Sequence, residues 1–138
     1  MNRIIQGNIL DIQSGIIAHQ VNCQRVAGAG LALQIRRKWP AWYTDYFNAV
    51  PFMGRASLFY VSKTLAIASL YAQHGYNKNT RQTDYKAFSV SLSALVRNTP
   101  GKDLYIPYGI GCGLGGGDWD AVSMMIDAVA PNAILVKL

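Results

Sequence analysis

Short apolar segments alternate with helical patterns along the whole chain, and this alternation limits the fold more than any other feature. Apolar side chains recur at helical spacing over residues 28–39, over the segment that starts at the capping residue Asp84, and over residues 118–129. The segments with the pattern of short buried strands are 2–6, 15–21, 56–62, 65–71, 104–108 and 132–138. Strands that alternate with helices predict an α/β domain, with helices on both faces of one sheet.

The composition fits one globular domain, which we expect to span residues 1–138. The two cysteines, Cys23 and Cys112, are too few for a disulfide framework, and no Cys/His cluster has metal-ligand spacing, so we expect no metal site and no cofactor. No charged-then-apolar leader opens the printed sequence. No apolar run reaches the roughly 20 residues of a membrane span. We therefore expect a cytoplasmic protein with no membrane partner.

Two further segments are defined by their side-chain chemistry. Residues 72–84 are polar and rich in turn formers, so we expect an exposed loop there. An aromatic segment follows the first predicted helix and ends near Pro51. Its rings are expected to belong to the core rather than to a stacking platform; with the last aromatic of the helix they are Trp39, Trp42, Tyr43, Tyr46 and Phe47.

The net charge is positive, because 13 Lys and Arg face 7 Asp and no Glu, which gives +6. Such a surface favours an anionic ligand or nucleic acid. The basic residues are scattered, however, and their one tight run is Arg36-Arg37-Lys38, which at helical spacing is most simply a solvated helix face. Nucleic acid is therefore an alternative partner and not the favoured one.

The strongest chemical signal is the loop 109–117, in which six of nine residues are glycine. Glycine lets the backbone approach a ligand closely, and successive N–H groups ahead of a helix form a phosphate cradle. Gly111, Gly113 and Gly116 satisfy the dinucleotide spacing GxGxxG. Only 22 residues follow Gly116, however, and the last eleven contain no acid, so the Rossmann context is missing. A P-loop motif is absent too.

A second loop, residues 22–30, also follows a predicted strand and leads into a helix. Loops of this kind meet at the carboxyl ends of the strands in an open α/β sheet, where ligands bind. Two anion-binding loops on one sheet predict a ligand with more than one anionic or polar anchor.

Three motifs in this order resemble the macro domain family: Gly7-Asn-Ile-Leu, the segment from Ala18 to Trp39-Pro40, and Gly111-Cys-Gly-Leu-Gly-Gly-Gly-Asp-Trp119. The resemblance covers nearly the whole chain. It is nearest to the compact group that includes ADP-ribose 1″-phosphate phosphatases and terminal ADP-ribose protein glycohydrolases. It implies a three-layer α/β/α fold with a central mixed sheet, and ADP-ribose or a close derivative as the ligand.

The resemblance also implies roles for individual residues. Asn8 and Ile9 match the segment that holds adenine, and Leu138 falls where related chains close over it. The residues that match the distal-ribose loop are Asn22, Gly28, Ala29 and Gly30. Those that match the diphosphate loop are Ile110, Gly111, Cys112, Gly113, Leu114 and Gly115. Arg25 and Ala27 depart from the family pattern, which has Gly and Met in many members.

The prediction of the catalytic residues depends on two side chains that the chain lacks. The glycohydrolases use a lysine before the mobile loop and an aspartate in the diphosphate loop, and the matching residues here are Gln73 and Gly115. Neither can form a Schiff base or shuttle a proton. The candidates that remain near the distal ribose are Asn22, His19 and Asp118. The resemblance therefore implies hydrolysis of ADP-ribose 1″-phosphate to ADP-ribose and phosphate.

Other interpretations stay open. The protein is alternatively a non-catalytic reader of ADP-ribose, or a hydrolase of protein- or nucleic-acid-linked ADP-ribose. His19 and His74 fit ordinary hydrogen-bonded histidines, both cysteines fit inert thiols, and Asp118 fits a helix N-cap. Tyr76 and Tyr108 are the aromatic residues placed to contact a nucleotide, and Lys78 is a nearby amine whose geometry nothing fixes.

Overall fold

A six-stranded sheet in the order β1-β6-β5-β2-β4-β3 forms the centre of the computed structural model, which describes residues 1–75 and 81–138. β3 runs antiparallel to β4 at one edge, and the other neighbouring pairs are parallel, so the sheet is mixed as predicted. The strands are β1 (Arg3–Gln6), β2 (Gly15–Asn22), β3 (Ala56–Tyr60), β4 (Leu65–Gln73), β5 (Leu104–Pro107) and β6 (Ile134–Lys137).

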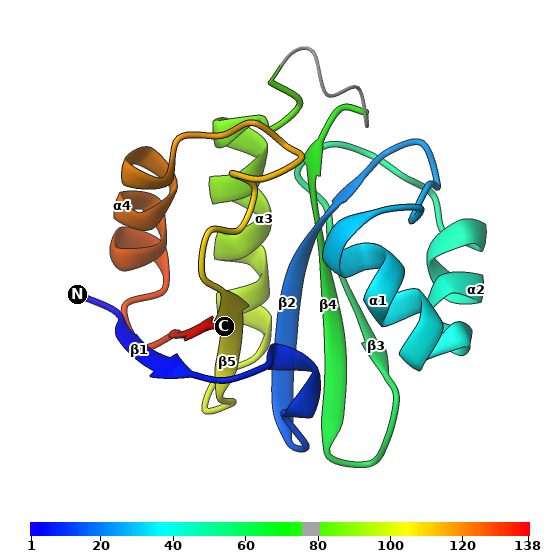
Figure 1. Cartoon of the computed structure of the whole chain (residues 1–138), viewed down its shortest axis with the longest axis horizontal. Coiled ribbons are helices and arrows are strands. Elements are labelled where there is room, and N and C mark those ends of the chain that lie inside the picture. Colours follow the sequence, from blue (N-terminus) through cyan, green and yellow to red (C-terminus); the bar gives the residue numbers. More distant parts are fainter. Residues whose placement is uncertain (76–80) are drawn as a thin grey trace.

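Helices cover both faces of this sheet, which confirms the three-layer α/β/α prediction (Figure 1). α1 (Gly30–Lys38) and α2 (Pro40–Asn48) lie on one face, and α3 (Tyr85–Asn98) and α4 (Trp119–Val129) lie on the other. α1 ends at the residue before Trp39, and Pro40 opens α2, where its missing N–H removes no helical hydrogen bond. A short 3-10 helix, η1 (Ile9–Asp11), follows β1 and was not predicted.

Each helical layer buries its own hydrophobic cluster against the sheet. Phe88 and Leu92 of α3 pack with Ile126 of α4 on one side. Ile35 of α1 packs with Trp42 and other α2 rings on the opposite side. β4 lies between the two clusters and is buried along its first eight residues, which explains its nearly continuous apolar sequence.

The aromatic prediction holds for some rings and fails for Phe47. Trp42 and Tyr46 are buried and stack with their ring centroids 5.2 Å apart. Phe47 is half exposed, because it lies on the solvent side of α2. The basic run at the end of α1 is exposed, as expected for a solvated helix face. Its cations also lie at the negative end of the helix dipole, and the Arg36 guanidinium lies 3.8 Å from the centroid of the Tyr43 ring.

The prediction of an exposed loop over residues 72–84 is wrong at both ends. β4 continues to Gln73, and Ala72 has no exposed surface. Thr83 is only 2% exposed and pairs with Gln73 in an isolated antiparallel bridge. Polar residues are buried here because their hydrogen bonds are made inside the protein, which composition does not reveal. Within residues 1–75 and 81–138, no helix is long and apolar enough to cross a membrane.

Candidate ligand-binding site

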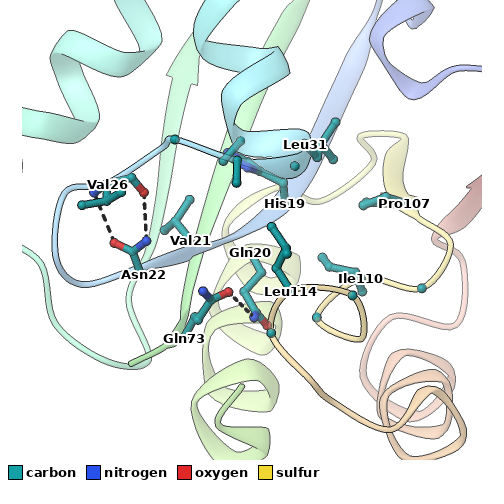
Figure 2. A pocket seen from close by; sticks show the side chains of 18 of the residues that line it. His19, Gln20, Val21, Asn22, Val26, Leu31, Gln73, Pro107, Ile110 and Leu114 are labelled. Carbon is teal, nitrogen blue, oxygen red and sulfur yellow. Dashed lines mark hydrogen bonds between the residues drawn. The ribbon is translucent and has the colours of Figure 1, made fainter. Parts of the chain in front are cut away.

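A cavity of about 540 Å³ opens at the carboxyl ends of β2 and β5, which are neighbours in the sheet (Figure 2). After β2 the chain continues into α1 on one face of the sheet, and after β5 it continues into α4 on the other face. This divergence makes the β2/β5 pair a topological switch point, where open α/β sheets bind ligands. Residues of both predicted loops line the cavity, so the sheet brings the two loops together as expected.

The glycine loop lines this cavity with residues whose backbone N–H groups are unused. Within the described part of the chain, the N–H groups of Gly111, Gly113, Leu114 and Gly115 make no hydrogen bond, and all four residues line the cavity. Two of the loop's carbonyl groups are occupied on the same stretch. The Gly111 carbonyl oxygen accepts from the Gly117 N–H at 2.8 Å, and the Gly115 carbonyl oxygen accepts from the Thr83 N–H at 3.1 Å. The loop therefore keeps several N–H groups free while these two carbonyls are bonded inside the protein.

The first turn of α1 forms the opposite wall. Ala29 is the N-cap residue and makes no side-chain capping bond, so the first N–H groups of the helix have no cap. Ala29, Gly30, Leu31 and Ala32 all line the cavity. The positive end of the helix dipole adds to the field of the glycine loop, and an anion between the two walls is favoured.

A second cavity of about 310 Å³ adjoins the first, with Leu31, Pro107 and Tyr108 lining both. Asn8, Ile9 and Leu138, the residues matched to the adenine segment, line it together. The Asn8 side-chain oxygen accepts the Leu10 N–H at 3.0 Å and so caps η1. Lys137 also lines this cavity, and its Nζ lies 4.6 Å from the centroid of the Tyr108 ring.

Charged side chains are absent from the walls of the larger cavity, as far as residues 1–75 and 81–138 show. Its one histidine, His19, is 1% exposed, and burial lowers the pKa of the imidazole to about 3. The ring meets Trp42 edge-on with centroids 4.9 Å apart, and neither ring nitrogen has a hydrogen-bond partner among the described residues. The prediction of an ordinary hydrogen-bonded histidine is therefore wrong. At neutral pH His19 is uncharged and cannot act as an acid.

Comparison with known proteins rests on solved structures, because no family model and no curated protein matches the sequence. A crystal structure of a Bacteroides thetaiotaomicron protein has a TM-score of 0.87 at 24% identity, with 99% of each chain covered. The macrodomain of Mycobacterium tuberculosis DarG has a TM-score of 0.82 at 20% identity, over 99% of this chain and 97% of that chain. The fold is that of a macrodomain. Thermosipho africanus DarTG, solved in complex with ADP-ribose, has a TM-score of 0.83 at 19% identity, over 100% of this chain and 42% of that chain.

The three-layer macro domain fold that the sequence motifs imply is therefore confirmed. The narrower resemblance to the compact group of phosphatases and glycohydrolases stays a prediction. The roles of the candidate catalytic residues stay predictions too.

Asn22 of this macrodomain is buried, and most of its amide is used inside the protein. Its Oδ1 accepts hydrogen bonds from the Gln24 N–H at 3.0 Å, the Val26 N–H at 3.3 Å and the Tyr46 hydroxyl at 2.9 Å. Its Nδ2 donates to the Val26 carbonyl oxygen at 2.8 Å, and Figure 2 shows the side chain turned toward Val26. One Nδ2 hydrogen is left for a ligand. The main role of the Asn22 amide in this structure is therefore to hold the loop after β2 in its conformation.

Two predicted site residues, Asp118 and Cys112, do not line either cavity. Asp118 is exposed and stands at the N-cap position of α4, as the alternative interpretation predicts, but its carboxylate makes no capping hydrogen bond. The Cys112 thiol donates to the Ile110 carbonyl oxygen at 3.3 Å. Burial, with a contribution from the Asp118 charge, raises the pKa of this thiol to about 11, which fits the inert thiol of the alternative interpretation.

The two positions that match the lysine and the aspartate of the glycohydrolases are Gln73 and Gly115, and neither is charged. Gln73 lines the cavity, and its Oε1 accepts from Gln20 Nε2 at 3.1 Å. A Cβ at Gly115 would lie 2.4 Å from Thr83 Oγ1 and 2.8 Å from the Gly111 carbonyl oxygen, so no side chain fits there. The absence of the aspartate is therefore built into the packing.

Other residues singled out from the sequence lie away from the cavity or outside the described residues. Arg25 has a φ of 61°, does not line the cavity, and donates to the Ala49 carbonyl oxygen at 3.2 Å. Tyr76 and Lys78 lie outside the described residues. Sequence reasoning missed several lining residues that belong to strand ends or to α1, where the only signal was their place beside the two loops. They are Gln20, Val21, Leu31, Ala32, Gln34 and Pro107, and Val26 of the loop after β2 lines the larger cavity as well.

Proposed function

We propose that this macrodomain binds ADP-ribose, with the diphosphate between the glycine loop and α1, the adenine in the smaller cavity and the distal ribose beside the loop after β2. The observation that carries the proposal is the set of free N–H groups at Gly111, Gly113, Leu114 and Gly115, which line the same cavity as the uncapped first turn of α1. Backbone donors fixed in this way bind a diphosphate without a cationic side chain. ADP-ribose in the Thermosipho africanus relative supports the same ligand class.

The proposal assigns binding rather than acid–base catalysis to the cavity. A matched general acid or base commonly contributes about 10²–10⁴-fold to a rate. The described walls contain no such group that is charged at neutral pH, and His19 is held neutral by burial. Hydrolysis of ADP-ribose 1″-phosphate, the activity that the resemblance implies, would depend on uncharged groups such as Asn22 and His19 to position a water, as far as the described residues show. We expect that reaction to be slow at most.

Calorimetric titration with ADP-ribose, AMP and NAD in parallel tests the binding proposal. We expect ADP-ribose to bind in the micromolar range, about −7 to −9 kcal/mol, and more tightly than AMP because AMP leaves the distal part of the cavity empty. Equal affinities for ADP-ribose and AMP would contradict the placement of the diphosphate and the distal ribose.

A phosphate-release assay with ADP-ribose 1″-phosphate tests the catalytic alternative, and Asn22→Ala is its control variant. Efficient turnover that Asn22→Ala abolishes would make the protein an enzyme and not a reader. We place the binding activity in the cytoplasm, a proposal supported by two free cysteines, Cys23 and Cys112.

A further inference from the structure

Thr83 lies outside both cavities, yet its side chain contacts the back of the glycine loop. It is 2% exposed, and its Oγ1 donates to the Gly111 carbonyl oxygen at 2.8 Å. Its backbone N–H, together with that of Gln82, donates to the Gly115 carbonyl oxygen at 3.1 and 2.9 Å. One residue thus holds two carbonyl groups of the loop on the side away from the ligand.

The direction of each hydrogen bond around the hydroxyl follows from its partners. A carbonyl oxygen can only accept, so the single Thr83 hydroxyl hydrogen goes to Gly111. The Thr83 oxygen then accepts from Gln20 Nε2, which lies 2.9 Å away and also donates to Gln73 Oε1. Each hydrogen atom in this set of hydrogen bonds has one acceptor, so the Thr83 hydroxyl has one defined orientation.

The carbonyls of Gly111 and Gly115 lie at the two ends of the loop segment that carries the free N–H groups of Gly113, Leu114 and Gly115, and all of these residues line the cavity. Because Thr83 bonds both carbonyls, it fixes both ends of this segment. The hydroxyl also occupies the space that a side chain at position 115 would need, which explains why that position is glycine.

We propose that Thr83 is a positioning residue that pre-organises the diphosphate loop, with Gln20 orienting its hydroxyl; this inference rests on the proposed function. On this proposal Thr83 does not contact the ligand. It contributes to the affinity for ligands that contain a diphosphate and does not contribute to the affinity for adenosine.

Three variants test the inference. Thr83→Val keeps the shape of the side chain and removes the hydroxyl, and Thr83→Ser restores the hydroxyl. Thr99→Val is the matched control, because Thr99 Oγ1 also donates to a backbone carbonyl, that of Leu95 at 2.7 Å, but lines neither cavity. We expect Thr83→Val to weaken ADP-ribose binding about five- to tenfold, the scale of one lost hydrogen bond. Adenosine binding should not change, Thr83→Ser should restore affinity, and Thr99→Val should leave it unaltered.

Backbone NMR of the ligand-free proteins gives a readout that does not depend on the ligand. We expect the order parameters of Gly111, Gly113 and Leu114 to fall from about 0.85 toward 0.6 in Thr83→Val and to stay high in Thr99→Val. If the wild type binds no ADP-ribose, the proposed function fails, and the NMR result alone decides whether Thr83 orders the loop. A Thr83→Val protein with unchanged loop order, or with an equal loss of adenosine and ADP-ribose binding, would overturn the inference.

Discussion

Gly113→Val separates the fold from the site more sharply than any other substitution in the glycine loop. A Cβ at Gly113 would meet no heavy atom within 4 Å, and Gly113 is not among the glycines with positive φ. The neighbouring Gly111, by contrast, has a φ of 75°, and its Cβ would lie 2.9 Å from Gln20 Oε1. A valine at 113 therefore fits the free protein and projects into space that the ligand needs.

The magnitude follows from the donors that the new side chain would block. The N–H groups of Gly113 and Leu114 are both free and both face the cavity. A hydrogen bond to a charged group contributes about 1.5–3 kcal/mol, so the loss of two weakens binding by about 3–6 kcal/mol. Micromolar affinity for ADP-ribose would then fall by about 10²–10⁴-fold, to the limit of calorimetric detection.

Calorimetry with ADP-ribose and thermal unfolding, run on the same preparations, check this expectation. Gly101→Val is the matched control, since Gly101 has a φ of 74° and lines neither cavity. The control should lose about 1–3 kcal/mol of stability through backbone strain and keep its affinity. Wild-type affinity in a folded Gly113→Val protein would refute the assignment of this loop to the diphosphate.

Further predictions concern packing, salt and pH. Gly115→Ala should lower the free energy of unfolding by about 1–3 kcal/mol, because its Cβ meets Thr83 and backbone. A urea midpoint equal to that of the wild type would contradict the close contact between Thr83 and position 115. The Kd for ADP-ribose should change less than about threefold between 50 and 200 mM salt, whereas nucleic-acid binding through 6–10 phosphate contacts would weaken by about 10³–10⁵-fold. Lowering the pH from 7 to 5 should cost about 2 kcal/mol of stability, because His19 takes up a proton near 6.5 when unfolded but only near pH 3 when folded. His19→Gln should remove that part of the slope, and an identical slope in the variant would show that another group titrates.

The sequence was sufficient to predict the layers and the meeting of the two loops. Both predictions depend on periodicity and on the rule that parallel strands end at one edge of a sheet, and neither needs side-chain detail. The grouping of Asn8, Ile9 and Leu138 came from the resemblance to macro domains instead, and the three residues do line one cavity.

Hydrogen bonds between residues far apart in the chain could not be predicted from the sequence. The differences between prediction and structure arise from these bonds. The polar neighbours of Thr83 predict an exposed loop, yet Thr83 is buried and its hydroxyl bonds Gln20, 63 residues away, and Gly111. Asp118 stands where a cap is typical, yet its carboxylate bonds nothing in α4. Asn22 was identified as a site residue, but its amide is used mainly by its own loop. Local sequence indicates what a group can bond, and only the tertiary structure decides which partner it receives.

The wall shared by the two cavities has a consequence for which molecules the protein can detect. Leu31, Pro107 and Tyr108 line both cavities, so a ligand that fills both cavities contacts these residues and is bound at two points. Joining two weakly bound halves raises their combined affinity by about 10²–10⁴-fold over either half without any new contact. Cleavage of the pyrophosphate bond would undo this bivalency, and both halves would dissociate. If the proposed function holds, we expect a domain with this arrangement to bind the intact molecule much more tightly than either of its two degradation products.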